Sequence, residues 1–377
     1  MIKCEDFFDI LKKKNLTFFT GIPDSTFKDL IKFLCDKDNK LLKNLIACNE
    51  CEAIAISAGH YLSTHEVGIV YMQNSGLGKA VNPLTSLCDP DIYSIPILLM
   101  IGWRGEPGEI DAPQHKKMGK VTISLLETLD IPYCVLKPDL REIEIELEKA
   151  LKYFREREGP YAFVIKRNFF YEYTMEKEKK VDFELSREDA IKIIMNKIDI
   201  DTLIISTTGY TSRELFEYRE STKRDHFKSF YNIGSMGCAS SIGLGIALNR
   251  KERVVIFDGD AAAIMQMGAF STIGKYSPPN LTHIIFDNQA HESTGGQPTN
   301  SPAIDFVKIA LACNYKSAQI VKTEDELKDS LKNLKNKKGP NLLLIKIKMG
   351  SNSNLRRPEK LPTEYKEEFM NFLRKTQ

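Results

Sequence analysis

The sequence predicts two doubly wound α/β domains, each built on a parallel β-sheet. The chain has 377 residues, and a length of about 150 residues per domain indicates two hydrophobic cores. Short apolar runs alternate with amphipathic stretches along the whole chain, which is typical of strands and crossover helices in a sheet covered on both faces. The alternation stops at a charged segment after residue 170 and then starts again.

The first half is expected to form an N-terminal domain over residues 1–170. Its apolar runs predict strands near residues 16–21, 45–48, 67–72, 95–102, 133–137 and 161–166. Helices are expected between them, at about residues 24–36, 50–64, 76–88, 117–129 and 140–156. This order is that of a parallel sheet with crossover helices.

Residues 171–185 have little apolar periodicity and many charges, so they are expected to be a linker. A C-terminal domain is then expected over residues 186–377. Its strands are predicted near residues 202–207, 228–232, 253–258, 282–287, 316–321 and 341–347. Its helices are predicted at about residues 186–198, 210–222, 237–249, 264–276, 303–312 and 324–335, with a final amphipathic helix in the tail.

The composition excludes several classes of protein. A net charge of +2 gives no general attraction to nucleic acid or to anionic membranes. No apolar segment approaches the roughly 20 uncharged residues of a membrane helix. The N-terminus is charged and has no signal-peptide core. We therefore expect a cytoplasmic protein with no nucleic-acid or membrane partner.

The eight cysteines do not form a disulfide framework over this length, and most are expected to be buried apolar groups. Cys48 and Cys51 have the spacing of a zinc knuckle. No second CxxC or His pair completes four ligands. A metal site is not expected there.

Polar residues follow two apolar runs of the second half. Asp258, Gly259 and Asp260 come at the end of one run, and Asn288 comes directly after the next. Parallel sheets bind ligands at the carboxyl ends of their strands. Mg²⁺ prefers oxygen ligands and is usually held by one or two protein groups together with phosphate oxygens. Asp260, the amide oxygen of Asn288 and the carbonyl of Ala290 would supply such ligands, although Asp and Asn also commonly cap helices and turns.

The spacing of this pair resembles a known signature. Asp260 and Asn288 lie 28 residues apart, which is similar to the GDG…N signature that binds Mg²⁺ and the cofactor diphosphate in thiamin-diphosphate enzymes. The chain departs from it at Ala261, where the family has glycine. A methyl group there is expected to tighten the approach of the backbone to the phosphate and to weaken the motif slightly.

The first half resembles the domain that binds the cofactor's pyrimidine ring in this family. Residues 45–62 combine a strand, the pair NE and a helix rich in small residues. The resemblance implies that Glu50 hydrogen-bonds to the aminopyrimidine and activates the cofactor, and that Glu52 supports the site or the helix dipole. Dipole stabilisation alone is the alternative for Glu50. In the family the two domains meet across a subunit interface, so a homodimer or higher homo-oligomer is implied.

Residues 230–248 resemble the stretch that supports the bent cofactor. Met236 has the position of the apolar wedge between the two rings, and four glycines would allow close approach of the backbone: Gly234, Gly237, Gly243 and Gly245. A packed glycine-rich helix is the alternative. The cofactor-binding residues implied by the resemblance are, besides Glu50, Gly209, Gly234, Ser235, Met236, Gly259, Asp260, Ala261, Ala262 and Asn288.

Five segments, at residues 20–30, 72–87, 101–119, 206–217 and 291–299, resemble the phosphonopyruvate decarboxylase family within the 2-oxo acid decarboxylases. The resemblance implies two domains of the pyrimidine-binding and diphosphate-binding types, without a middle domain. It implies conversion of 3-phosphonopyruvate to phosphonoacetaldehyde and CO₂ in phosphonate biosynthesis. The alternatives are another 2-oxo acid decarboxylase and a non-catalytic scaffold, the latter indicated by Ala261 alone. Sulfopyruvate decarboxylases typically divide the halves between subunits, so one fused chain favours the phosphonate enzyme.

The resemblance also implies roles near the reacting carbon. Asp24 and His115 resemble the acid and the histidine that related decarboxylases use when a proton is delivered after CO₂ is lost. Capping of a helix by Asp24 is the alternative.

A substrate with a carboxylate and a phosphonate requires local cations, and guanidinium groups bind phosphonate oxygens in pairs. The candidates are Arg104, Arg213 and Lys79. Arg356 and Arg357 in the tail are weaker candidates, because a solvated surface position also explains them.

Overall fold

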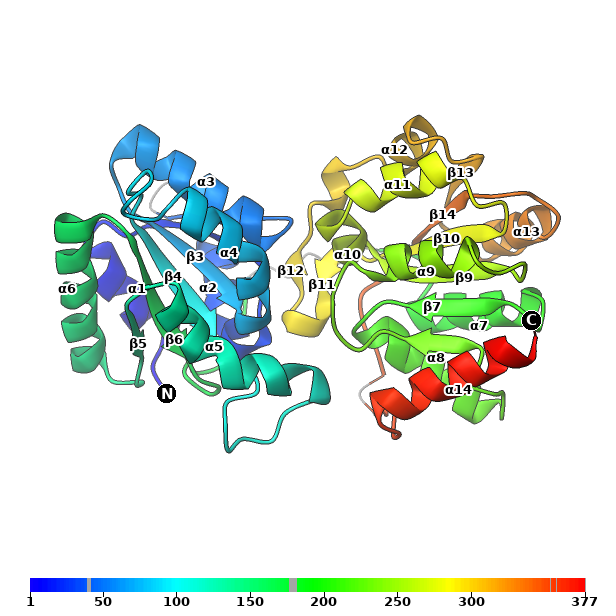
Figure 1. Ribbon diagram of the computed structural model, residues 1–377, viewed down its shortest axis with the longest axis horizontal. Helices are drawn as coiled ribbons and strands as arrows, with labels where there is room; N and C mark the ends of the chain where they lie inside the picture. Colours follow the sequence, from blue (N-terminus) through cyan, green and yellow to red (C-terminus); the bar gives the residue numbers. More distant parts are fainter. Residues whose placement is uncertain (39–41, 176–181, 353, 357, 377) are drawn as a thin grey trace. The chain divides into compact units, whose positions relative to one another are not determined.

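The computed structural model describes the chain except residues 39–41, 176–181, 353, 357 and 377. The chain forms two compact units. One comprises Met1–Glu178 with Ser293–Pro298, and the other Lys179–Glu292 with Thr299–Gln377. Each unit contains a six-stranded parallel sheet (Figure 1), so the expected fold class is confirmed. Part of the expected linker, residues 176–181, lies outside the described residues.

The N-terminal unit has the strand order β2-β1-β3-β4-β6-β5. The strands are β1 (Phe18–Gly21), β2 (Lys43–Ile46), β3 (Gly68–Gln73), β4 (Ile97–Gly102), β5 (Tyr133–Val135) and β6 (Pro160–Ile165). The helices are α1 (Cys4–Lys12), α2 (Lys28–Lys37), α3 (Glu50–Thr64), α4 (Leu77–Ser86), α5 (Lys116–Thr128) and α6 (Leu140–Arg157). Short 3₁₀ helices are η1 (Ser25–Phe27), η2 (Asn74–Gly76) and η3 (Pro113–His115), and β12 (Gln297–Pro298) also belongs to this unit.

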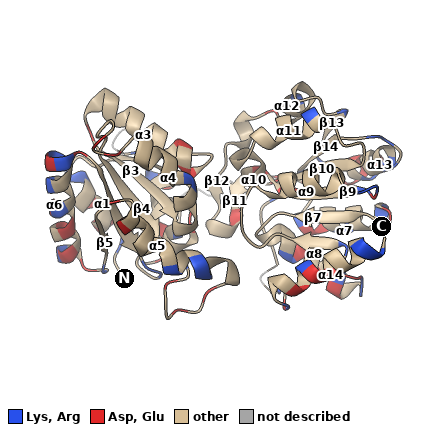
Figure 2. Cartoon of the chain, in the orientation of Figure 1, with Lys and Arg blue, Asp and Glu red and all other residues tan. Residues whose placement is uncertain are grey.

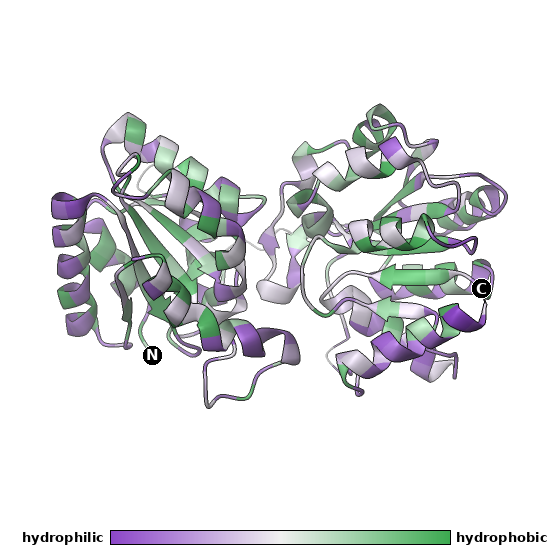
Figure 3. Cartoon of the chain, in the orientation of Figure 1, coloured by the Kyte–Doolittle hydropathy of each residue, from purple (hydrophilic) through white to green (hydrophobic). Residues whose placement is uncertain are grey.

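Helices cover both faces of this sheet, which explains why its central strands are apolar without alternation. All six residues of β4 and of β6 are buried. Phe7 of α1, Leu30 of α2 and Ile143 of α6 belong to one core cluster with strand side chains. Figure 3 shows hydrophobic strands inside the unit and hydrophilic residues along α6.

Helix α1 was missed in the sequence. Cys4, Phe7, Phe8 and Leu11 are all buried and have the spacing of one helical face. The helical periodicity is therefore present in the sequence, but charged residues lie between the apolar ones and no helix was predicted there.

The C-terminal unit has the strand order β13-β14-β10-β9-β7-β8. The strands are β7 (Leu203–Ser206), β8 (Ser229–Tyr231), β9 (Val254–Gly259), β10 (Leu281–Asp287), β13 (Ser317–Val321) and β14 (Asn341–Lys346), with the short β11 (Ala290–His291) and the 3₁₀ helix η5 (Ser301–Ala303) beyond β10. The 3₁₀ helix η4 (Glu292–Thr294) begins with the last residue before the segment that belongs to the N-terminal unit. The helices are α7 (Arg187–Lys197), α8 (Tyr210–Ser221), α9 (Ala239–Ala247), α10 (Asp260–Met265), α11 (Gly268–Tyr276), α12 (Phe306–Ala312), α13 (Glu324–Leu334) and α14 (Pro362–Lys375).

The prediction of a single helix at residues 264–276 is wrong. The chain forms two helices there, because α10 begins at Asp260 directly after β9 and the backbone leaves the helical region at Gln266, with φ −129° and ψ 46°. Helix α11 then starts at Gly268. The consequence is that Asp260 and Ala261 lie in a helix rather than in a loop.

The strand orders place a ligand-binding position in each sheet. In the N-terminal unit β1 lies between β2 and β3, and in the C-terminal unit β7 lies between β8 and β9. The chain therefore reverses its direction of winding beside β1 and beside β7, and open α/β sheets bind ligands at the carboxyl ends of strands at such points. Within the described residues, every helix is too short or too polar to span a membrane.

Candidate functional site

Asp260 stands at the carboxyl end of β9 as the first residue of α10, and only 2% of its surface is exposed. Thr299 donates a hydrogen bond from its hydroxyl to the Asp260 carboxylate. Burial, and after it the charge of Asp287, raises the pKa of Asp260 above its usual range, and the Thr299 hydrogen bond opposes the change. Among the described residues no lysine or arginine pairs with Asp260. A bound cation would supply the missing positive charge.

Asn288 follows β10, the strand next to β9, and is also buried. Its Nδ2 donates to Glu292 Oε2 at 2.9 Å, and its Oδ1 accepts from the Ala290 backbone at 3.1 Å. Arg187 donates to the same Glu292 oxygen at 2.9 Å and binds Glu214 through two nitrogens, at 2.9 and 3.0 Å. This buried network fixes the orientation of the Asn288 amide.

Within the described residues, no group of three or more His, Cys, Asp or Glu side chains could hold a metal ion. A magnesium ion at Asp260 would therefore have one carboxylate, with the Asn288 amide oxygen and the Ala290 carbonyl as further ligands. This donor set fits an ion that shares its coordination with phosphate oxygens. A Cβ added to Gly259 would meet no atom within 4 Å, so space is open beside it. Neither Cys48 nor Cys51 forms a disulfide bond with a described residue.

Two further loops follow β7 and β8. Gly209, with φ +90°, is the residue directly before α8. The hydroxyl of Thr208 donates to the Ile233 carbonyl at 3.0 Å, which joins the two loops. Ser235 has φ +51°, and Met236 beside it is half-buried. The expected residues Gly209, Gly234, Ser235 and Met236 thus lie together at the strand ends.

Local structure explains why glycine occurs at two positions near this loop, Gly237 and Gly243. Gly237 has φ +88°, which favours glycine. A Cβ on Gly243 would lie 2.5 Å from Ile256, so α9 approaches β9 closely there. Gly245 differs, since an added Cβ would meet open space.

Ala261 lies inside α10 and has no positive φ, and Ala262 beside it is buried. The methyl group of Ala261 is therefore compatible with the local backbone. We expect Ala261→Gly to destabilise α10 by about 0.5–1 kcal/mol, because glycine loses more backbone entropy in a helix. Titration calorimetry should show an unchanged affinity for thiamin diphosphate. A tenfold gain in affinity would instead support the weakened-motif interpretation.

Glu50 is the first residue of α3, with three residues between it and the end of β2, and 7% of its surface is exposed. The helix starts with a reciprocal cap, because Asn49 accepts from the Glu52 backbone at 3.0 Å and the Glu52 carboxylate accepts from the Cys48 backbone. Glu52 thus supports the turn that presents Glu50.

The Glu50 carboxylate has an oxygen without a donor. Oε2 is buried and accepts no hydrogen bond from the described residues, and Lys79 Nζ lies 3.8 Å from it, beyond hydrogen-bond distance. A Cβ on Gly76 would lie 2.5 Å from the other carboxylate oxygen, so glycine leaves room for the group. An unsatisfied buried carboxylate fits a ligand that brings an N–H donor, such as an aminopyrimidine.

Asp24 follows β1 and is fully buried. Burial raises its pKa to about 6, while the Thr26 side chain and the charge of Arg104 act in the opposite direction. Asp24 makes no side-chain cap hydrogen bond to η1, which does not favour the capping alternative. A Cβ on Gly102 would lie 1.9 Å from its carboxylate, so Asp24 lies against the end of β4.

Arg104 follows β4 and reaches the segment that holds Asp24. Its guanidinium donates to Ser25 Oγ at 2.7 Å and binds the two oxygens of Asp111 at 2.8 and 2.7 Å. Arg167 also pairs with Asp111, at 2.7 Å. The structure therefore brings Arg104 and Asp24 together, with Asp111 as the present counter-charge.

His115 is buried in η3, at the far end of the loop that begins with Arg104. A Cβ on Gly105 would lie 2.2 Å from the His115 carbonyl, so the two ends of this loop touch. Asn74, which follows β3, donates to the Arg104 carbonyl at 2.8 Å and to Thr122 of α5 at 2.9 Å. Asn74 also ends an apolar run, but it was not among the site residues predicted from the sequence.

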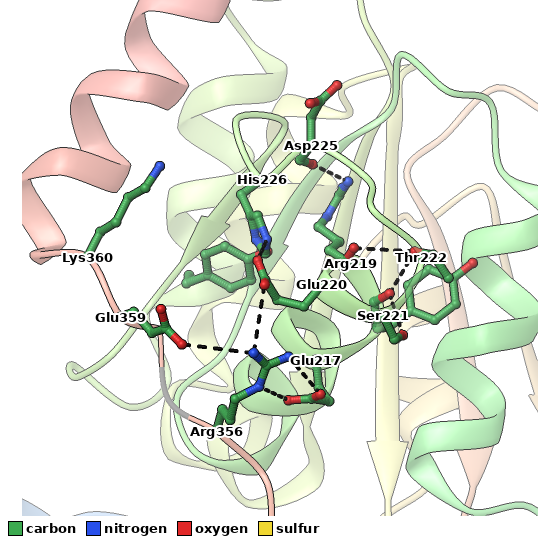
Figure 4. Close-up of polar contacts among 12 residues, drawn as sticks. Glu217, Arg219, Glu220, Ser221, Thr222, Asp225, His226, Arg356, Glu359 and Lys360 are labelled. Carbon is green, nitrogen blue, oxygen red and sulfur yellow. Dashed lines mark hydrogen bonds and ion pairs between the residues drawn. The ribbon is translucent and has the colours of Figure 1, made fainter.

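Arg213 and Arg356 belong to the C-terminal unit. Arg213 donates to the backbone carbonyls of Leu355 and Arg356, and its guanidinium lies 5.5 Å from the ring of Tyr210. Arg356 binds both oxygens of Glu217 at 3.0 Å (Figure 4). These arginines anchor the tail to α8, and Arg357 lies outside the described residues.

The pKa of Asp24 predicts a pH-dependent stability. Because its folded pKa, about 6, exceeds the ordinary value of 3.8, the folded state binds more protons between these values and the free energy of unfolding falls as pH rises. The loss is about 3 kcal/mol by pH 7. Asp24→Asn should remove this loss. The free energy of unfolding of the variant, relative to that of the wild type, should therefore increase from pH 4 to pH 7. Urea unfolding followed by the fluorescence of the single tryptophan, Trp103 of the N-terminal unit, measures this difference. A constant difference over this range would contradict the assignment.

Comparisons with known proteins agree with this arrangement. Residues 4–122 match the thiamine pyrophosphate enzyme N-terminal TPP binding domain, and residues 207–345 match the C-terminal TPP binding domain. The fold and both matches define a thiamin-diphosphate enzyme with two cofactor-binding domains.

Three relatives define the class more closely. A phosphonopyruvate decarboxylase of Streptomyces viridochromogenes is 32% identical over 99% of this chain and 95% of its own. A sulfopyruvate decarboxylase subunit beta of Methanococcus maripaludis is 37% identical over 51% of this chain and 100% of its own. A sulfopyruvate decarboxylase of Methanosarcina acetivorans is 26% identical over 92% of both chains. The chain belongs to the phosphonopyruvate decarboxylase family of thiamin-diphosphate-dependent 2-oxo acid decarboxylases.

The third relative corrects the expectation that one fused chain favours the phosphonate enzyme. A sulfopyruvate decarboxylase also spans both halves in one chain. The fusion of the two halves therefore does not distinguish the substrates.

Proposed function

We propose that this protein decarboxylates 3-phosphonopyruvate to phosphonoacetaldehyde and CO₂, with thiamin diphosphate and Mg²⁺. The observation that supports the chemistry best is the buried Glu50 oxygen without a donor. The substrate is supported by the full-length identity of 32% with a phosphonopyruvate decarboxylase, against 26% with the full-length sulfopyruvate decarboxylase.

The bound cofactor would supply an electron sink for the carbanion that loss of CO₂ leaves. Asp260, Asn288 and the Ala290 carbonyl would hold Mg²⁺. Glu50 would hydrogen-bond to the pyrimidine ring and hold or exchange a proton there. Asp24, whose pKa is raised to about 6 by burial, is partly protonated near neutral pH and can give a proton to the product carbon, a contribution of about 10²–10⁴ in rate.

Arg104 and Lys79 are the proposed phosphonate-binding residues. Both lie at the carboxyl edge of the N-terminal sheet, Arg104 beside Ser25 and Lys79 beside Glu50. Arg213 is engaged by tail carbonyls, so we assign it to the tail rather than to the substrate. His115 is retained as a residue for proton transfer. The pyrimidine-binding and diphosphate-binding residues lie in separate units, and we propose that the active site forms between subunits of a homo-oligomer.

The substrate assignment is tested by kcat/KM for three 2-oxo acids with Mg²⁺ and thiamin diphosphate. Phosphonopyruvate is expected to exceed pyruvate by about 10²-fold or more, because pyruvate lacks the second anion and each hydrogen bond to a charged group contributes about 1.5–3 kcal/mol. It is also expected to exceed sulfopyruvate, since a dianion is attracted more strongly by Arg104 and Lys79 than a monoanion. A preference for sulfopyruvate would overturn the proposal.

A further inference from the structure

A groove lies on the C-terminal unit, away from the strand ends described above. It is lined by Arg219 and Glu220 at the end of α8, by residues 223–227 before β8, by Lys360, and by four residues of α14, and its volume is about 640 Å³. The four residues of α14 are Glu368, Asn371, Phe372 and Lys375. Helix α14 is held beside β8 by aromatic contacts, with ring centroids 5.6 Å apart for Tyr231 and Tyr365 and 6.0 Å apart for Phe230 and Phe369. None of the proposed cofactor or substrate residues lines this groove.

The groove contains a buried guanidinium without an acidic partner. Only 5% of the surface of Arg219 is exposed. Its Nη1 donates to the Asp225 backbone carbonyl at 2.6 Å, whereas its Nε is buried and has no acceptor. In the described part of the chain no carboxylate pairs with Arg219, and Figure 4 shows the Asp225 carboxylate directed away from it. Burial of an unpaired charge is costly, so a counter-charge would stabilise this arrangement.

The other side chains leave the groove positive. Its basic residues are Arg219, Lys223, Arg224, Lys360 and Lys375, and its acidic residues are Glu220, Asp225 and Glu368, which gives 5 − 3 = +2. Figure 2 shows charges of both signs on α8 and α14.

Two of the three acids already have partners. Glu220 hydrogen-bonds to His226 Nε2 at 2.6 Å, and Glu368 pairs with Lys360. Lys223 and Lys375 form no ion pair with any described residue. Arg224 donates to the Met195 carbonyl and to Asn196 Oδ1, and it too pairs with no carboxylate in the described part of the chain. The free positive charge therefore lies at Arg219, Arg224 and these two lysines.

A purely structural role explains only part of this arrangement. Arg219 ties the loop before β8 through one hydrogen bond to Asp225. A guanidinium has five N–H donors in a planar fork, and the buried Nε remains unsatisfied. An anion with several oxygens would accept from such a fork in a bidentate manner.

We propose that this groove is a second, non-catalytic binding site for a tetrahedral dianion of the phosphate or phosphonate class, with Arg219 at its centre and Lys223 and Lys375 at its rim. The +2 charge of the groove matches such a dianion. The site does not depend on the proposed catalytic function, because it shares no residue with it.

The test is titration calorimetry of the full chain saturated with thiamin diphosphate and Mg²⁺, so that the diphosphate site is filled. Inorganic phosphate and methylphosphonate are titrated separately at constant ionic strength. We expect the groove to bind one anion per chain with a Kd on the order of 1 mM or lower. An anion bound at the proposed phosphonate-binding residues, Arg104 and Lys79, would be counted separately, because its affinity should not change in variants of the groove. Either anion supports the site, and the tighter one identifies the source of the ligand.

Variants connect the binding to the groove. Arg219→Met is expected to weaken anion binding by about tenfold or more, because it removes a hydrogen bond from a charged donor. Lys223→Gln with Lys375→Gln removes two exposed charges without touching the Arg219–Asp225 contact, and should weaken binding by about threefold or more. This pair keeps the test valid if Arg219→Met does not fold.

The matched control is Lys251→Gln with Lys337→Gln, which removes the same charge from exposed positions of the same unit outside the groove. Its affinity should equal that of the wild type. Equal affinities in wild type, control and groove variants would overturn the proposal, and so would the absence of binding up to about 20 mM anion.

Discussion

Glu50→Gln is expected to lower kcat by about 10²–10⁴, because the amide cannot exchange a proton at the pyrimidine nitrogen. The substitution keeps the size of the side chain beside Gly76, so folding and cofactor affinity should change little. Rates of aldehyde formation from phosphonopyruvate and calorimetric affinities for thiamin diphosphate, measured on the same preparations, separate these effects.

Glu52→Gln is the matched control, two residues further along α3. Its carboxylate accepts a hydrogen bond from the Cys48 backbone as part of the helix cap, and weakening a cap costs about 0.5–2 kcal/mol of stability. We expect a lower Tm and a nearly unchanged kcat. Equal losses of kcat in both variants would show that Glu50 only stabilises helix α3 and has no role in proton exchange.

Asp260→Asn is expected to abolish the stabilisation of the protein by Mg²⁺ and thiamin diphosphate. A ligand at 100 times its Kd stabilises the folded state by about 2.7 kcal/mol, and the wild type should show the corresponding rise in Tm. The variant lacks the carboxylate that we assign to the metal, so its Tm should not respond. Thermal unfolding of the C-terminal unit with and without both ligands measures this difference.

Asp258→Asn is the control for Asp260→Asn. Asp258 is equally buried, but it accepts from the Gly259 backbone at 3.0 Å and contacts His283 Nε2 at 3.3 Å. Its loss should lower Tm and preserve the rise on ligand addition. A full ligand response in Asp260→Asn would remove this residue from the metal site.

The strand ends could be predicted because two local signals coincide there. An apolar run marks a buried strand, and the polar residues that come at its end mark the carboxyl end, as for Asp24, Asp260 and Asn288. The side chains of all three are buried at these ends. The same rule would have found Asn74, which closes β3.

The partners of these residues could not be predicted, because they are distant in the sequence. Arg187 lies 105 residues from Glu292 and 27 residues from Glu214, yet one buried network joins them. Likewise, Arg213 looked available for an anion, but the tail carbonyls that it binds are 142 and 143 residues away. Only tertiary packing decides which cations remain free for a ligand.

The groove shows the same limitation. Residues 219–227 and 360–375 come together only because α14 packs against β8. Each segment alone has mixed charge and is typical of a solvated helix face. The unpaired state of Arg219 is a property of the fold.

The most direct test of the account is CO₂ release from phosphonopyruvate by the purified protein, with and without thiamin diphosphate and Mg²⁺. The account predicts that CO₂ and phosphonoacetaldehyde form in equal amounts, and only when both cofactors are present. If the protein binds thiamin diphosphate tightly but releases no CO₂ from phosphonopyruvate, the proposed reaction is wrong.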